Sequence, residues 1–188
     1  MSVFQKLLVN AVKTMPENIV WLFSKKYIAG KTLQSAIDTV KQLNSKGIYA
    51  TLDVLGESIK TKEEAVEAKR KALEVLDAIV ANKLLANLSI KPTQMGLAID
   101  QQLAYQNVLE LVKKANEINN FVRIDMEDSP YTDLTLDLYR KIYQNYKNLG
   151  VVLQAYLKRT SNDTIVLNKQ GTNYRLCKGI YIEPENIA

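Results

Sequence analysis

Strand-like segments and helical segments alternate along most of this chain of 188 residues. The strand-like segments are short apolar runs rich in β-branched residues, and the helical segments carry apolar residues three and four positions apart. Strands that alternate with helices assemble as a parallel sheet with right-handed crossovers. The sequence therefore predicts an α/β protein. Its five predicted strands are residues 48–54, 85–91, 121–126, 151–157 and 174–181.

Two parts of the chain differ in their pattern. Residues 1–46 read as a helical segment, and residues 47–188 read as a β/α domain. Thr32 is a typical N-cap, Gly47 suits the left-handed position after a helix, and Thr61 with Glu64 forms a capping box. The sequence predicts helices over 32–47, 61–82, 100–118 and from Ser129-Pro130 to near Gly150, with a linking segment at 161–171.

The alternation leaves two architectures open, a doubly wound open sheet and a (β/α)8 barrel. A dinucleotide-binding open sheet would carry Gly-x-Gly-x-x-Gly after its first strand, and only Gly56 follows that strand here. At about 28 residues for each unit, an eight-unit barrel needs roughly 225 residues, so residues 47–188 provide only about five units. The number of strands does not choose between the two.

Composition limits the chemistry. The chain has no histidine and one cysteine, Cys177, which excludes histidine-based catalysis, a disulfide framework and a cysteine zinc cluster. No metal site is expected. The excess of 25 basic over 20 acidic residues is scattered along the chain, so nucleic-acid binding is not expected. No apolar run approaches the ~20 residues of a membrane span, and we expect a cytoplasmic protein.

Charged and polar residues occur inside the later strands or at their ends. Buried parallel strands normally read as continuous apolar runs, and an unpaired buried charge is costly. These residues should therefore face a ligand or one another, and their convergence from four strands favours a site over a scaffold. Arg123, Asp125 and Glu127 should share one face of their strand, whereas a loop or helix-capping role is the expectation for Asp53. The set is Lys91, Arg123, Asp125, Gln154, Arg175 and Lys178.

Four ordered motifs resemble the proline dehydrogenase family of FAD-dependent (β/α)8-barrel enzymes. They are NLSIKPTQMG (87–96), RIDMEDSPYTDLTLDLY (123–139), VVLQAYLKRT (151–160) and YRLCKGIYIEP (174–184). The resemblance covers essentially the whole chain. It implies a TIM-type barrel of which about five β/α units are present, preceded by the helical segment.

The resemblance also implies roles for individual residues. Lys91, Asp125 and Arg175 match catalytic positions: Lys91 contacts proline, Asp125 is the active-site aspartate, and Arg175 contacts the flavin near N5. A second set matches FAD-binding positions, in which the glutamine bonds the isoalloxazine and the last three residues form a turn. That set is Met126, Gln154, Lys178, Gly179 and Ile180.

The implied reaction is oxidation of L-proline to Δ1-pyrroline-5-carboxylate, with electrons passed to a quinone at the inner face of the membrane. One departure bears on this reaction. Family members grip the proline carboxylate with a pair of adjacent arginines in a later helix, and no arginine pair occurs in this sequence. The chain therefore reads as C-terminally truncated, and we expect little or no turnover from these 188 residues alone.

A non-catalytic alternative remains at this point. A five-strand barrel fragment would expose two strand edges and an apolar interior face, so it could act as a self-association or interaction module that forms homo-oligomers. Flavin binding distinguishes the two readings, because only the enzyme reading requires it.

Overall fold

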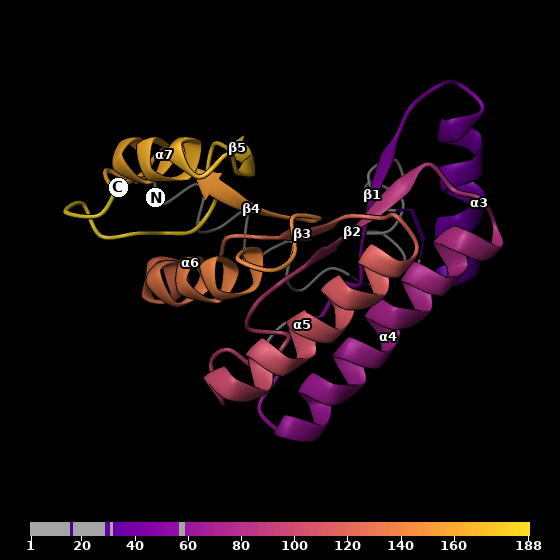
Figure 1. Cartoon of the computed structure of the whole chain (residues 1–188), viewed down its shortest axis with the longest axis horizontal. Helices are drawn as coiled ribbons and strands as arrows, with labels where there is room; N and C mark the ends of the chain where they lie inside the picture. Colours follow the sequence, from indigo (N-terminus) through magenta and orange to yellow (C-terminus); the bar gives the residue numbers. More distant parts are fainter. Residues whose placement is uncertain (1–15, 17–28, 31, 57–58) are drawn as a thin grey trace.

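The computed structural model describes residue 16, residues 29–30, 32–56 and 59–188 (Figure 1). Of the predicted helical segment over 1–46, residues 1–15, 17–28 and 31 lie outside these residues. The helices are α3 (Leu33–Asn44), α4 (Lys62–Ala81), α5 (Gln101–Glu117), α6 (Ser129–Tyr143) and α7 (Thr160–Lys169). The strands are β1 (Ala50–Asp53), β2 (Ala86–Ile90), β3 (Val122–Ile124), β4 (Leu149–Gln154) and β5 (Asn173–Cys177).

The five strands form one parallel sheet in the order β1-β2-β3-β4-β5, so each strand pairs with its neighbours in sequence. Helices α4, α5 and α6 connect successive strands and pack against them on one side (Figure 1). This order is that of consecutive barrel units, whereas a doubly wound sheet reverses its strand order. Within the described residues, β1 and β5 are the two edges of the sheet.

Local sequence signals explain where the helices begin. Thr32 and Thr61 accept hydrogen bonds from the backbone N–H three residues on, and Ser35 and Glu64 return the bond to complete two capping boxes. Asp100 caps α5 through the N–H groups of Gln102 and Leu103.

Several predicted boundaries are wrong. Helix α3 ends at Asn44, although Gly47 does take a positive φ of 74°. Helix α6 ends at Tyr143 rather than near Gly150, because Gly150 lies inside β4. The predicted linking segment 161–171 is mostly the helix α7. Strands β1 and β5 are shorter than predicted, and β4 begins two residues earlier than its predicted start.

The two faces of the sheet differ in chemistry. Successive residues of each strand lie on opposite faces of the sheet, and the pairing register aligns these faces across the five strands. The face against the helices is apolar, and its centre, which Leu88, Ile124 and Val151 form, is fully buried. The opposite face lines the interior in a barrel. It is polar, so the prediction of an apolar interior face was wrong. Its residues include Thr51, Asn87, Ser89, Arg123, Asn173 and Arg175.

Candidate functional site

Lys91 and Asp53 form an ion pair at the carboxyl ends of β1 and β2. Asp53 is the last residue of β1 and Lys91 directly follows β2. The Lys91 Nζ lies 3.3 Å from the Asp53 Oδ2, and both side chains are largely buried, with 14% and 23% of their surface exposed. Asp53 is therefore part of the charged carboxyl end of the sheet, which we call the rim, and the expectation of a loop or capping role was wrong. The pair keeps two charges together that would be costly to bury separately.

Asp125 and Arg175 form a second ion pair at the same end of the sheet. The Arg175 Nη2 donates to the Asp125 Oδ1 at 2.7 Å, across strand β4. The Ser89 hydroxyl donates to the same oxygen at 2.9 Å. About half of the Arg175 side chain is exposed, so its guanidinium retains donors that face away from Asp125. The carboxylate is thus held between β2 and β5.

Glu127 lies beyond the end of β3 and is almost fully buried. Its carboxylate accepts hydrogen bonds from the Thr93 N–H at 2.8 Å and from the Thr93 hydroxyl at 2.6 Å. Burial raises the pKa of this carboxyl, and the bonds from Thr93 and the nearby Lys91 charge oppose that rise. Arg123, Asp125 and Glu127 were predicted to share one face of their strand. Arg123 lies in β3 and Asp125 directly follows it, whereas Glu127 lies further on and bonds Thr93 in the loop after β2.

Gln154 connects the loops after β3 and β5. It is the last residue of β4 and is fully buried. Its Nε2 donates to the Glu127 carbonyl oxygen at 2.9 Å, and its Oε1 accepts from the Ile180 N–H at 3.4 Å. The Gln154 amide therefore links the Glu127 loop to the turn over residues 178–180, and one Nε2 hydrogen is left for another acceptor.

The turn over residues 178–180 packs against Tyr156. The Tyr156 N–H donates to the Lys178 carbonyl oxygen at 3.2 Å. Gly179 has a φ of +105°, and a Cβ on it would lie 2.1 Å from the Tyr156 ring. Only glycine fits this conformation and this contact. Lys178 and Ile180 are exposed on either side of it.

The structure brings most of the predicted site residues to one end of the sheet. Asp125 meets Arg175, Gln154 meets Ile180, and Lys91 lies at the end of β2. Met126 is buried in the hydrophobic core. Cys177 is half-buried and packs against the core. Sequence reasoning missed Ser89, Thr93 and Asn173. The only signal for Ser89 and Asn173 is that polar residues alternate with apolar ones in β2 and β5, which marks the barrel-interior face.

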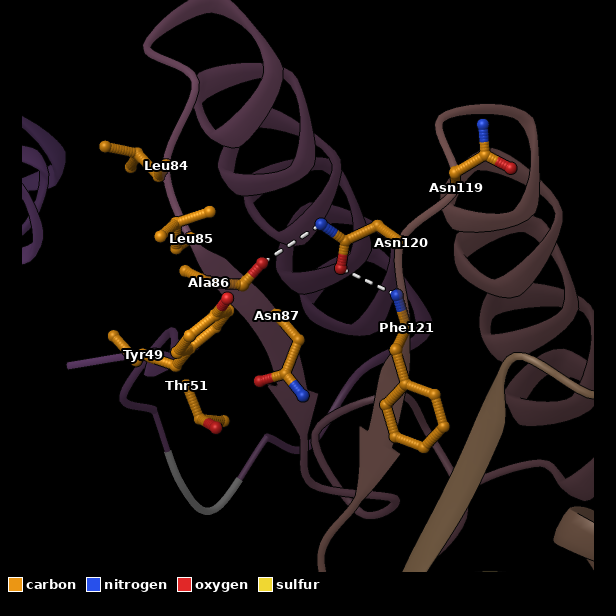
Figure 2. Close-up of a pocket in the computed structure, with 10 residues that line it drawn as sticks. Tyr49, Thr51, Leu84, Leu85, Ala86, Asn87, Asn119, Asn120 and Phe121 are labelled. Atoms are coloured by element: carbon orange, nitrogen blue, oxygen red, sulfur yellow. Dashed lines mark hydrogen bonds between the residues drawn. The ribbon is translucent and has the colours of Figure 1, made fainter. Parts of the chain in front are cut away.

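A shallow cavity of about 480 Å³ lies at the opposite, amino end of β1–β3 (Figure 2). Its lining is neutral, with Tyr49, Thr51, Asn87 and Phe121 around it. The Asn120 amide lies at one side, donating to the Ala86 carbonyl and accepting from the Phe121 N–H. The charged groups gather at the carboxyl end instead, where parallel β/α folds place their chemistry. In the described part of the chain, no group of three or more metal-ligating side chains is present.

Known proteins resemble this chain in sequence and fold. A family model described as proline dehydrogenase matches residues 36–188. Proline dehydrogenase 1 of Bacillus subtilis (strain 168) is 36% identical over 167 residues, which cover 89% of this chain and 55% of that protein. Proline dehydrogenase of Deinococcus radiodurans is 31% identical over 182 residues, covering 94% of this chain and 59% of that protein. The chain thus spans little more than half the length of these relatives.

The crystal structure of proline utilization A from Bdellovibrio bacteriovorus, inactivated by N-propargylglycine, superimposes with a TM-score of 0.73 at 24% identity. The match covers 83% of this chain and 20% of that one. Proline utilization A from Corynebacterium freiburgense gives a TM-score of 0.64 at 23% identity, covering 80% and 17%. These matches confirm the predicted fold, about five consecutive units of a TIM-type barrel. Because the family model matches 36–188, which includes the whole sheet and its polar rim, the chain belongs to the proline dehydrogenase family.

Proposed function

We propose that this chain carries the reaction centre of an FAD-dependent proline dehydrogenase, which oxidises L-proline to Δ1-pyrroline-5-carboxylate and passes the electrons to a quinone. The observation that supports it most is the rim of the sheet. Lys91, Asp125 and Arg175 take part there in ion pairs at the ends of their strands, in a chain that belongs to the proline dehydrogenase family.

The residues at the end of β4 and β5 fit a flavin. Arg175 and Lys178 are exposed cations three residues apart in the chain, and they suit a cofactor that carries phosphates and becomes anionic on reduction. Gly179 keeps the turn free of a side chain where Tyr156 approaches. Gln154 has one amide hydrogen left, and Met126 is a buried apolar residue that directly follows Asp125. We assign Met126, Gln154, Lys178, Gly179 and Ile180 to cofactor binding.

The reaction removes a hydride from C5 of proline and a proton from its nitrogen, so that a C=N bond forms. When bound, FAD supplies the hydride acceptor. The protein must then position the substrate and stabilise charge. Lys91, held by Asp53 at 3.3 Å, is placed to contact the substrate. Asp125 fixes the Arg175 guanidinium at 2.7 Å, and this arginine stabilises negative charge at the cofactor.

Two further parts of the proposal concern turnover and location. The 188 residues contain no pair of adjacent arginines, so we expect flavin binding with little or no turnover from this chain alone. None of the helices in the described residues is long and apolar enough to cross a membrane. We propose a cytoplasmic location with peripheral contact at the inner face of the membrane, where a quinone acceptor would lie.

The first test is an absorbance spectrum of the purified chain after addition of FAD and desalting, repeated without oxygen in excess L-proline. Retained flavin supports the cofactor site, and bleaching by proline supports the reaction and refutes the expectation of little turnover. Flavin that stays oxidised supports the cofactor site together with that expectation. No retained flavin refutes the cofactor assignment and favours the interaction module.

Arg175→Met is the informative variant and Arg140→Met its matched control. Arg140 lies on α6 and is paired with Asp137 at 3.1 Å, so its loss removes an ion-paired arginine from the helix layer instead of from the rim. We expect Arg175→Met to lower the amount of FAD retained and Arg140→Met to leave it unchanged. Equal retention in the two variants would contradict the role given to Arg175.

A further inference from the structure

Arg123 reaches from β3 across β4 to β5. Its Nη2 donates to the Asn173 side-chain Oδ1 at 2.8 Å, and its Nη1 donates to the Asn173 carbonyl at 3.2 Å and to the Val151 carbonyl at 3.3 Å. One guanidinium thus joins three strands. Asn173 is the first residue of β5, the edge strand that carries Arg175.

Gly150 provides the space for this connection. It pairs with Arg123 on one side and with Asn173 on the other. A Cβ at Gly150 would lie 2.5 Å from the Arg123 Nη1 and 2.5 Å from the Asn173 carbonyl oxygen. The Phe121 ring covers the guanidinium, 4.8 Å from the Arg123 Cζ to the ring centroid. The passage across β4 is therefore shaped for this side chain.

The charge of Arg123 has no carboxylate partner within salt-bridge distance among the described residues, and its bonds go to neutral oxygens. Burial and the nearby Arg175 charge lower its pKa. Burying part of a cation is costly, and its hydrogen bonds to neutral oxygens offset that cost. The three bonds also fix the geometry of three strands, because the planar guanidinium accepts few orientations.

Two connections between β3 and β5 lie one above the other. Arg123 bonds Asn173 at the amino end, and two residues further along each strand Asp125 bonds Arg175. Both cross β4, and both lie on the barrel-interior face. The connection at the amino end therefore adds to the backbone pairing between β4 and β5 in holding the strand that carries Arg175.

We propose that Arg123 is a positioning residue, which holds the start of β5 against β3 so that Arg175 reaches Asp125. Arg123 itself contacts neither substrate nor cofactor. The consequence for flavin binding rests on the proposed function, whereas the effect on β5 does not.

Hydrogen–deuterium exchange measured by mass spectrometry on the full chain without FAD tests the first part. Arg123→Met removes all three bonds, and Asn173→Ala removes only the 2.8 Å bond while keeping the charge. We expect faster exchange over 173–180 in both variants, smaller in Asn173→Ala, and no change in the control Arg140→Met. Exchange over 173–180 that stays at the wild-type rate in both variants overturns the proposal. Arg123→Lys, which keeps the charge and lacks the planar fork of donors, should restore the rate only in part.

FAD affinity in a double-mutant cycle tests whether Arg123 acts through Arg175. We expect Arg123→Met to weaken FAD binding roughly tenfold in the wild-type background, in the range of coupling between contacting groups. In the Arg175→Met background the same change should have little effect. An equal loss in both backgrounds means that Arg123 acts directly or through general stability, and overturns the positioning role. If the wild-type chain binds no FAD, the proposed function fails, and the exchange rates alone decide whether Arg123 holds β5.

Discussion

Gly179 gives the sharpest test of the turn assigned to cofactor binding. Its φ of +105° lies in the region that disfavours a side chain, and a Cβ there would lie 2.1 Å from two carbons of the Tyr156 ring. Gly171 provides a matched control, because its φ is +64° and a Cβ added to it would meet no atom within 4 Å. Both alanine variants bear the cost of a positive φ, and only Gly179→Ala meets an obstacle.

The two costs can be separated. A positive φ costs an alanine about 1–2 kcal/mol, so Gly171→Ala should lower the free energy of unfolding by that amount. Overpacking against a ring costs about 1–3 kcal/mol more. Gly179→Ala should therefore lose about 2–5 kcal/mol in all. The assay is equilibrium unfolding in urea, followed by far-UV circular dichroism.

Removing the ring should recover the second cost. Tyr156→Ala on its own loses the hydrogen bond from the Tyr156 hydroxyl to the Tyr181 carbonyl, 3.0 Å long, which costs about 1 kcal/mol. In that background, Gly179→Ala should cost about 1–3 kcal/mol less than in the wild type. The reasoning is refuted if Gly179→Ala costs no more than Gly171→Ala, or if the ring makes no difference to its cost.

Three further predictions concern stability. Burial raises the pKa of Glu127 above 4.5, so between pH 4.5 and that raised pKa the folded state binds more protons than the unfolded state, and stability falls as pH rises. Glu127→Gln should flatten this part of the plot of unfolding free energy against pH, measured by urea unfolding from pH 4.5 to about pH 7. An unchanged slope would contradict the assignment. Leu88 is fully buried and Leu55 is 73% exposed, so Leu88→Ala should cost about 2–5 kcal/mol and Leu55→Ala less than about 0.5 kcal/mol in the same assay. Asp100→Ala removes the cap of α5 and should cost about 1 kcal/mol, more than Asp137→Ala on the surface of α6; equal melting temperatures would argue against the cap.

The sequence predicts the parts of the fold that depend on local chemistry. All five strands were predicted because their helix-facing residues, such as Leu88 and Ile124, are apolar at every second position. The starts of α4 and α5 follow from capping residues whose bonds span two to three residues. Helix α7 was missed because its sequence TSNDTIVLNK has no regular apolar stripe. Its first turn is instead supported by Arg159, which bonds both Asp163 and Asp133.

Gly150 shows why a local rule led to the wrong boundary. Glycine after a helical pattern usually ends the helix, and the sequence therefore predicted that α6 continues to this residue. In the structure Gly150 lies inside β4, where the absence of a side chain lets Arg123 pass to Asn173. The reason for this glycine lies in two residues on other strands, one well before it and one well after it in the chain, and no local pattern contains that information.

The ion pairs of the rim depend on register in the same way. Asp53 and Lys91 are 38 residues apart, and Asp125 and Arg175 are 50 apart. The sequence identifies the charged groups, because charge inside a parallel strand is unusual, but it does not say which cation each carboxylate meets. The register places Asp53 beside Ser89, and Lys91 two residues on reaches back to it. Asp125 instead pairs across β4 with Arg175 of β5, and the oxygen that binds the guanidinium also accepts from the Ser89 hydroxyl on the β2 side. Ser89 thus helps to hold Asp125 at the place where Arg175 binds it, and it carries no charge by which the sequence could have marked it.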